Sequence, residues 1–398
     1  MYIMELTLNM YQSIGLSAVF YYVGVWIRKW VPVLTKYCVP APAVGGIAFL
    51  IISGVLHGFG ILTISFDTTF QNLLLWTFFA SVGMGSKPKM LGKVGKKFIY
   101  VFVACAILIL VQNIASVGIM TLFGKQPLIG MCVGSLPMVG GHATSGAWAD
   151  TLESAGVTGA LTISLAAATF GVLAGGTLGG PTARKLITKY NLAEEINESG
   201  VQVLEETATT GFIDNARFMK AAGLMVFCLI PGELLSNFLS SHGFILPASI
   251  GSLIFGCIIG MIFDEAHIDL PEEELNALGG CCLGLYLTLA MMSIKVWQLS
   301  GLAVPFILVL ILEALLTVAF AYFVIFRVAG RDYEAAVMAA GVIGFGLGAT
   351  PNALANMNTL KSRYGAAPQA YIIIPLLGTM FIDIVLSLIN TGFVNFIA

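Results

Sequence analysis

The chain has 398 residues, of which 58% are hydrophobic and only 10% are charged, whereas soluble domains carry roughly 25% charged residues. With a mean hydropathy of +0.93, this composition excludes an ordinary soluble domain, and the net charge of -2 gives no basis for binding nucleic acid. One helical span takes about 20 apolar residues, so the length leaves room for about ten spans but not for a nucleotide-driven motor domain. No phosphate-binding loop of the type Gly-x-x-x-x-Gly-Lys-Ser/Thr occurs in the sequence.

Apolar runs bounded by charges, proline or glycine predict ten transmembrane helices in an all-α polytopic membrane protein. In chain order the runs cover residues 6–27, 42–58, 70–86, 98–122, 156–183, 216–240, 247–263, 277–294, 302–326 and 369–390. The first run is expected to be a span of the mature protein, because no basic residue precedes Arg28. Two further segments, 127–153 and 333–358, are apolar but broken by glycine, proline and small polar residues. They are predicted to be re-entrant helical hairpins.

The distribution of lysine and arginine predicts the orientation, because cytoplasmic connections accumulate positive charge. If both termini are external, only Lys125 and Lys295 of the 19 basic residues lie outside. The polar segment 191–215 is then a cytoplasmic linker between a five-span half at 1–190 and a second five-span half at 216–398.

Two short matches indicate that these halves are repeats. Residues 42–47 (PAVGGI) return at 247–252 (PASIGS), and residues 143–149 (ATSGAWA) return at 349–355 (ATPNALA). Because each half has an odd number of spans, the second half enters the membrane from the opposite side. Inverted repeats with paired broken segments are typical of secondary transporters, whose site lies near mid-membrane.

The hairpins carry the groups expected to bind ligands. Thr144 is predicted to cap a helix that starts at Ser145, and Thr350 precedes Pro351 in the preferred order of N-cap and first-turn proline. Helix N-termini bind anions, so a carboxylate can be held although the spans contain no lysine or arginine in their centres. Oxygen ligands for a small cation such as sodium are offered by carbonyls of Gly140, Gly141, Gly346 and Gly348 and by side chains of Ser135, Thr144, Ser145, Thr350, Asn352 and Asn356.

Ionisable residues inside spans are costly, so each is a functional candidate. Asp383 lies deep in the last predicted span, where a cation ligand or a proton carrier is expected. Structural or interface roles are expected for Glu233 and Glu313, and His142 is a candidate for substrate contact or for stabilising a hairpin tip. The stripe Gly171, Gly175 and Gly179 is expected to be a packing face. The seven cysteines are interpreted as small buried apolar residues, with no metal site or disulfide framework.

At these residues the chain resembles the bacterial sodium/glutamate symporter family over essentially its whole length. The resemblance rests on residues 36–46, Gln112-Asn113, the first hairpin motif at 134–148 (GSLPMVGGHATSGAW), the second at 344–357 (GFGLGATPNALANM), and residues 375–383. The sequence departs from the family pattern at Ala143 and Asn352, where glycine and threonine are common, and at Glu313, where a glutamine is expected.

The resemblance implies uptake of L-glutamate with sodium as the coupling ion, and no other cofactor, across the bacterial inner membrane. It also implies an elevator-like homodimer in which a mobile domain moves against a scaffold. The expected substrate site comprises Ser135, Gly140, Gly141, His142, Thr144, Ser145, Thr350, Pro351, Asn352 and Asn356. The expected sodium site comprises Gly346, Gly348, Ala349 and Asp383. A proton-coupled carrier of a related dicarboxylate or amino acid remains the alternative. A channel and an intramembrane hydrolase built on His142 are less well supported, and no enzymatic activity is expected.

Overall fold

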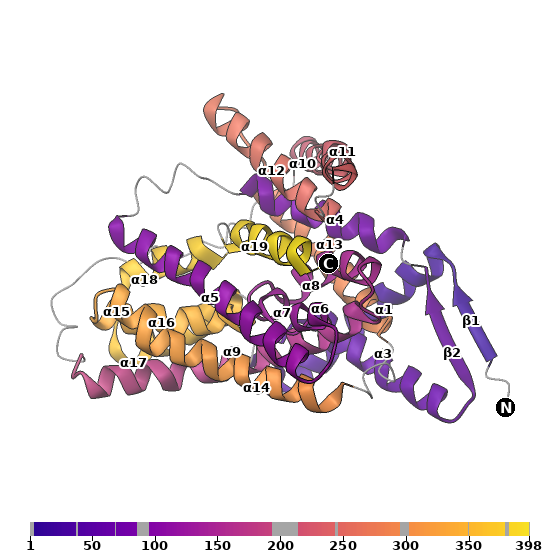
Figure 1. The fold of residues 1–398 in the computed structure, drawn as a ribbon. Helices are drawn as coiled ribbons and strands as arrows, with labels where there is room; N and C mark the ends of the chain where they lie inside the picture. The colour runs from indigo at the N-terminus through magenta and orange to yellow at the C-terminus, as the bar shows by residue number, and fades with distance from the viewer. Residues whose placement is uncertain are drawn as a thin grey trace.

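The computed structural model describes residues 4–36, 39–67, 69–85, 95–192, 214–242, 246–294, 302–348, 350–378 and 382–397. These residues form a helical molecule with one small parallel sheet (Figure 1). Within these ranges, seven helical segments are long and apolar enough to cross a membrane, and each overlaps one of the ten predicted spans. The prediction of an all-α polytopic membrane protein is confirmed at this level.

The chain does not begin with a helix at residue 6, as the apolar pattern predicted. It begins with strand β1 (Met4–Leu8), which pairs in parallel with β2 (Leu62–Phe66). Helix α1 (Met10–Trp30) follows, and Asn9 and Gln12 cap its N-terminus by exchanging two hydrogen bonds of 3.0 Å. This capping box fixes the helix start at residue 10 and leaves the preceding residues extended.

The two predicted halves contain the following helices, in chain order. The first half continues with α2 (Pro32–Lys36), α3 (Ala41–Gly58), α4 (Thr69–Gly85), α5 (Lys96–Leu122), α6 (Pro127–Met131), α7 (Ser135–Met138), α8 (Gly141–Ser154) and α9 (Ala160–Lys189). The second half consists of α10 (Asn215–Phe227), α11 (Leu229–Ser241), α12 (Ala248–Glu265), α13 (Glu272–Met292), α14 (Ala303–Phe320), the π-helical turn η4 (Ala321–Ile325), α15 (Phe326–Val328), α16 (Tyr333–Gly346), α17 (Thr350–Tyr364), α18 (Pro368–Leu376) and α19 (Ile382–Ile397).

The last predicted span, 369–390, is described in two parts. Helix α18 covers its first part, to Leu376, and α19 covers its last part, from Ile382. Pro375 lies inside α18 and has no backbone N–H. It therefore cannot donate the helical hydrogen bond to the carbonyl of Tyr371, one turn earlier. Gly378 follows within three residues, and both residue types weaken a helix. Residues 379–381 lie outside the described ranges.

The helices pack in two groups, and each group takes elements from both halves. The scaffold-side group contains α1, α3, α4 and α10 to α13, and the hairpin-side group contains α5 to α9 and α14 to α19. In Figure 1 the first group lies at the top and right, and the second lies at the left and bottom. The main contacts between the groups join α4 and α13 to α8, and α13 to α9.

Glycines set the closest helix crossings in the scaffold-side group. A Cβ on Gly24 of α1 would lie 2.0 Å from the Ala41 carbonyl oxygen, and one on Gly45 of α3 would lie 1.9 Å from the Phe20 carbonyl oxygen. The corresponding crossing of α11 and α12 is made by Gly232 and Gly251, whose backbones meet in the same way. Both crossings bring the backbones of two helices into direct contact through glycine.

We expect Gly24→Val to lower the stability of the purified protein by about 3 kcal/mol, because the new side chain meets backbone and not a movable side chain. Gly15→Val is the matched control, since Gly15 lies on the same helix with nothing within 4 Å of its Cβ position. Thermal unfolding in one detergent measures both variants. Equal melting temperatures for the two would contradict the glycine crossing.

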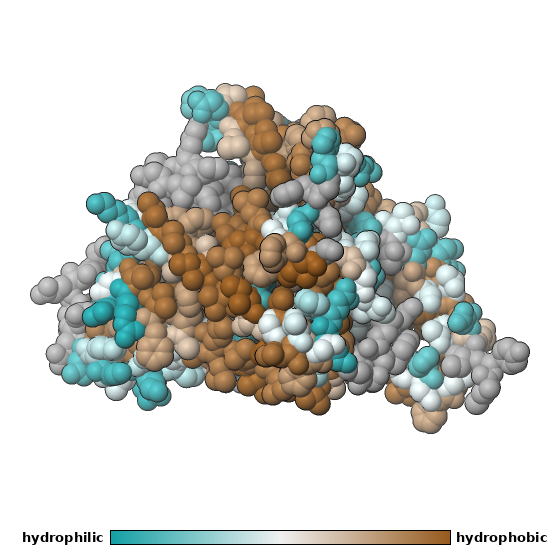
Figure 2. Space-filling model, in the orientation of Figure 1, coloured by the Kyte–Doolittle hydropathy of each residue, from teal (hydrophilic) through white to brown (hydrophobic). Residues whose placement is uncertain are grey.

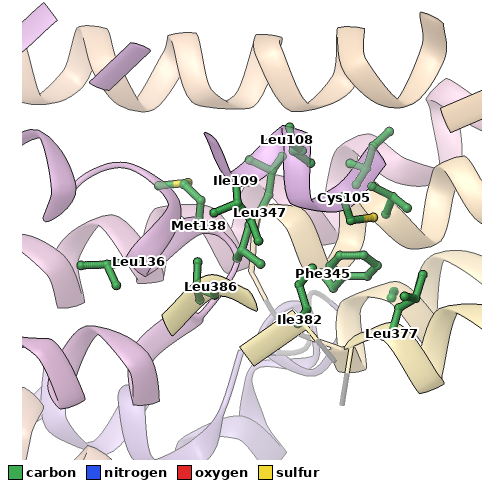
Figure 3. Close-up of a cluster of buried hydrophobic side chains, with 14 of the residues drawn as sticks. Cys105, Leu108, Ile109, Leu136, Met138, Phe345, Leu347, Leu377, Ile382 and Leu386 are labelled. Atoms are coloured by element: carbon green, nitrogen blue, oxygen red, sulfur yellow. The ribbon is translucent and has the colours of Figure 1, made fainter. Parts of the chain in front are cut away.

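Figure 2 shows a broad hydrophobic surface over α5, α14 and α19. Its large exposed apolar side chains include Ile107, Ile114, Ile311 and Leu315, which a soluble protein would bury. Hydrophilic residues gather at the left edge, where Figure 1 places the start of α5 and helices α15 and α17. Beneath this surface a buried cluster joins α5 and α7 to the ends of α16, α18 and α19 (Figure 3). Side chains from both halves therefore form the core around the hairpins.

Candidate functional site

Both predicted hairpin segments are pairs of packed helices. In the second, α16 and α17 run antiparallel: the Cβ position of Gly344 lies 2.4 Å from the Ala353 amide, and that of Gly341 lies 3.1 Å from Met357 Sδ. In the first, the incoming arm is broken into α6 and α7, and α8 forms the returning arm in contact with α7. Glycine and proline at the breaks, including Gly134 and Pro137, account for the short pieces.

The two hairpin tips meet around one pocket of about 280 Å³. The first tip contributes residues 139–144, and the second contributes Gly348, Thr350 and Pro351. The third side is formed by Gly378 and Asp383 of the last predicted span. The remaining lining residues come mainly from the scaffold-side group, namely Pro40, Phe78, Phe79, Leu283 and Leu287, with Val172 of α9. The pocket therefore lies where the two helix groups meet and where both halves converge.

Three helix N-termini border this pocket. Helices α8, α17 and α19 begin at Gly141, Thr350 and Ile382 and have 14, 15 and 16 residues. The first turns of α8 and α17 contain no acidic residue, whereas that of α19 contains Asp383. Free N–H groups and the positive ends of two helix dipoles are thus open to anions, and one carboxylate of the protein lies beside them. No lysine or arginine is among the described lining residues.

Gly141 allows the closest approach of the two tips. Its φ of +64° belongs to the left-handed region, and a Cβ there would lie 2.7 Å from the Gly348 carbonyl oxygen. Gly140 packs on Thr144 in a similar way, with its Cβ position 2.6 Å from Thr144 Oγ1. Residues with side chains at these positions would separate the tips or distort the backbone, so the glycine pair is needed for this geometry.

The two predicted helix caps at the tips are placed differently from expectation. Helix α8 begins at Gly141, so Thr144 lies inside its first turn and is not the N-cap. Thr350 is the first residue of α17, and its hydroxyl donates to the Gly378 carbonyl at 2.9 Å. This hydrogen bond joins α17 to the last predicted span.

The structure brings eight of the fourteen expected site residues into the pocket lining. These are Gly140, Gly141, His142, Thr144, Gly348, Thr350, Pro351 and Asp383. His142 is 6% exposed, and its Nε2 lies 3.1 Å from Thr169 Oγ1 of α9. Ala349 lies outside the described residues.

The other expected residues are buried next to the tips. The side chains of three of them bond to backbone carbonyls, although Asn352 Oδ1 has no partner within the described residues. Ser145 donates to the Gly141 carbonyl at 2.7 Å. Asn352 and Asn356 of α17 donate to the carbonyls of Val172 and Gly175 on α9, at 2.7 and 2.8 Å. They therefore hold the second hairpin against α9 and do not line the pocket.

Ser135 belongs to a buried polar network behind the first hairpin. Its backbone N–H donates to Asn113 Oδ1 at 3.1 Å, and its hydroxyl accepts from Asn390 Nδ2 at 3.3 Å. Asn113 in turn donates to Asn390 Oδ1 at 3.0 Å, which links α5, α7 and α19. Gly346 is tied to α5 as well, because its carbonyl accepts from Gln112 Nε2 at 3.1 Å.

The glycine stripe of α9 is a packing face, as predicted. A Cβ on Gly171 would lie 2.1 Å from the Leu347 carbonyl oxygen, and one on Gly179 would lie 2.1 Å from Asn356 Nδ2. A Cβ on Gly175 would lie 2.9 Å from the Gly344 carbonyl oxygen. The prediction for the cysteines is wrong at Cys281, which is exposed on α13.

Sequence reasoning missed the apolar wall of the pocket. Phe78, Phe79, Leu283 and Leu287 sit in ordinary hydrophobic runs of α4 and α13, so no pattern separates them from lipid-facing neighbours. Asn390 was missed as well, although a buried asparagine in the last span is a signal of a polar contact between helices.

Comparison with known proteins identifies the family of the chain. The family model described as sodium/glutamate symporter matches residues 6–366. A sodium/glutamate symporter of Haemophilus influenzae is 32% identical over 390 residues, covering 96% of each chain. One of Escherichia coli is 33% identical over 361 residues, covering 89% of this chain and 90% of the relative. The chain therefore belongs to the sodium/glutamate symporter family.

Proposed function

We propose that the protein imports L-glutamate together with sodium across the bacterial inner membrane, and that the hairpin-tip pocket binds both. The observation that carries the proposal is the meeting of two acid-free helix N-termini, at Gly141 and Thr350, in one pocket without lysine or arginine among its described lining. Glutamate carries two carboxylates, and each matches one N-terminus. Family membership supplies the substrate and the ion, since the relatives are named sodium/glutamate symporters.

Sodium is proposed to bind beside the substrate, near Asp383 of the last predicted span. Asp383 is the acidic residue in the described pocket lining, which Gly348 also lines, and the Gly348 carbonyl faces Gly141 of the first tip. A carboxylate and carbonyl oxygens are the ligands that hard cations prefer. We assign Gly346, Gly348, Ala349 and Asp383 to this site, and a bound cation offsets the charge of the substrate carboxylates.

Alternating access is proposed to occur by movement of the hairpin-side group against the scaffold-side group. The pocket lies between the two groups, and its scaffold wall is apolar, formed by side chains such as Phe79 and Leu287. An apolar wall makes no directional bonds with a substrate, so it permits sliding. The two sequence matches between the halves support two inverted repeats. A homodimer is part of the same proposal.

Uptake into proteoliposomes tests the proposal. Purified protein with an inward sodium gradient should accumulate labelled L-glutamate, and replacing external sodium by choline should abolish accumulation. A proton gradient alone should not drive uptake. If the proton gradient alone suffices, the alternative of a proton-coupled carrier is correct, for which His142 and Asp383 are the titratable groups in the pocket.

We expect the linker 191–215 to be cytoplasmic and both termini to be external, because this placement leaves only Lys125 and Lys295 of the 19 basic residues outside. Single cysteines in a cysteine-free background should react with a membrane-impermeant reagent at residue 398 from outside, and in the linker only after cells are opened. Labelling of the linker in intact cells would reverse the orientation.

A further inference from the structure

Glu313 lies in the middle of α14 with a carboxyl group that is buried and unpartnered. The residue is 0% exposed, and within the described ranges neither Oε1 nor Oε2 has a hydrogen-bond partner. It belongs to the buried stripe of α14, which continues one turn later at Thr317. An ionised carboxylate without a partner in a membrane-protein interior is strongly unfavourable. A proton bound to Glu313 removes this cost.

A second buried oxygen without a partner faces the same stripe. Gln112 of α5 donates from Nε2 to Thr317 Oγ1 at 3.0 Å and to the Gly346 carbonyl at 3.1 Å. Its Oε1 is buried and has no hydrogen-bond partner in the described part of the chain. The Glu313 carboxyl and the Gln112 amide are therefore both neighbours of Thr317. A protonated carboxyl is a donor and Gln112 Oε1 is an acceptor, so one proton satisfies both groups.

The helices that contact α14 most extensively bring charge only near their ends. Among their described residues, the charged groups are Lys96 and Lys97 on α5, Arg184, Lys185 and Lys189 on α9, and Glu334 on α16. The other titratable groups are Tyr100 and Cys105 on α5, Tyr322 on η4 and Tyr333 on α16. The middle of α5 and α9 thus offers no ammonium or guanidinium group to neutralise Glu313, which leaves a proton to do so.

We propose that Glu313 is a proton-binding site that controls the Gly346 carbonyl at the end of α16. With the proton bound, the Gln112 N–H stays on that carbonyl, as in this structure. Without the proton, the carboxylate only accepts hydrogen bonds and draws the Gln112 N–H to itself, which frees the Gly346 carbonyl. The inference rests on the proposed function, in which this carbonyl is a sodium ligand. Loss of the proton then favours sodium binding, and sodium binding favours loss of the proton.

Two variants should shift the sodium affinity in opposite directions. Glu313→Gln carries an amide N–H in place of the acid proton, so at about pH 8 it should bind sodium more weakly than the unaltered protein does. Gln112→Leu removes the donor from Gly346, so at about pH 5.5 it should bind sodium more tightly than the unaltered protein does. In the unaltered protein the affinity should fall at least about fivefold between about pH 8 and about pH 5.5, since one linked proton allows up to about tenfold per pH unit.

The affinity is measured as sodium-dependent thermal stabilisation of the purified protein, and infrared spectroscopy reports the proton directly. The carbonyl band of a protonated carboxylic acid should be present at low pH and missing in Glu313→Gln. The inference is overturned if the sodium affinity keeps its full pH dependence in both variants. It is also overturned if Glu313→Gln has the same acid band as the unaltered protein. If Glu313→Gln does not fold, Gln112→Leu and the infrared titration of the unaltered protein decide. If sodium never binds, the proposed function fails, whereas the infrared band still tests the proton site.

Discussion

Glutamate uptake by Gly141→Ala is expected to fall by about 100-fold, because displacement of a site by about 1 Å costs a factor of this size. The new Cβ would lie 2.7 Å from the Gly348 carbonyl oxygen, so the two hairpin tips must separate. The alanine must also adopt a φ of +64°, which adds about 1–2 kcal/mol of backbone strain. Initial rates of labelled glutamate uptake in proteoliposomes, normalised to folded protein, measure the effect.

Gly124→Ala separates the two causes. Gly124 has a φ of +65°, nearly the same as Gly141, but nothing lies within 4 Å of its Cβ position. The backbone is strained in both variants, but only Gly141→Ala blocks the approach of the two tips. Uptake by Gly124→Ala should stay within about twofold of the unaltered protein. Equal loss in the two variants would show that strain alone matters and would remove the tip contact from the site.

Asp383→Asn is expected to raise the sodium concentration for half-maximal uptake at least about tenfold, which corresponds to about 1.4 kcal/mol of sodium binding. The substitution keeps the shape and one oxygen but removes the charge that faces the pocket. Glutamate affinity at saturating sodium should change much less. Sodium titrations of glutamate uptake, and glutamate titrations at high sodium, give the two quantities.

Three other roles of Asp383 predict different results. A proton carrier would lose the pH dependence of uptake while exchange of bound substrate continues. A partner of the substrate ammonium group would lose glutamate affinity even at saturating sodium. A packing residue would lower thermal stability and leave the sodium curve unchanged, which would sink the ligand assignment. Asp150→Asn is the control, because Asp150 is an exposed carboxylate of α8 outside the pocket.

Much of the fold follows from local sequence alone. Apolar runs between charged residues located α3, α4 and α5 to within two residues of their starts, because the helical period and the membrane length act on neighbouring residues. Breaks at Gly140-Gly141 and before Thr350 located both hairpin tips, because glycine and proline interrupt a helix wherever it packs. The last predicted span is described as α18 and α19, and Pro375 and Gly378 lie inside its otherwise continuous apolar run.

Local sequence patterns predict the membrane class, the two glycine-rich helix pairs and the residue types at their tips. Which of these residues reach the pocket depends on how helices from distant parts of the chain pack together. Thr144 and Asp383 line it, whereas Ser135 and Asn356 turn to Asn390 and to the Gly175 carbonyl. A buried polar side chain forms hydrogen bonds with whichever helix packs opposite it. The spacing of residues along one helix does not predict which helix that will be. The apolar wall of the pocket could not be predicted for the same reason. In the sequence, Phe79 and Leu287 resemble any other apolar residue of a span, and they line the pocket because α4 and α13 pack against the tips.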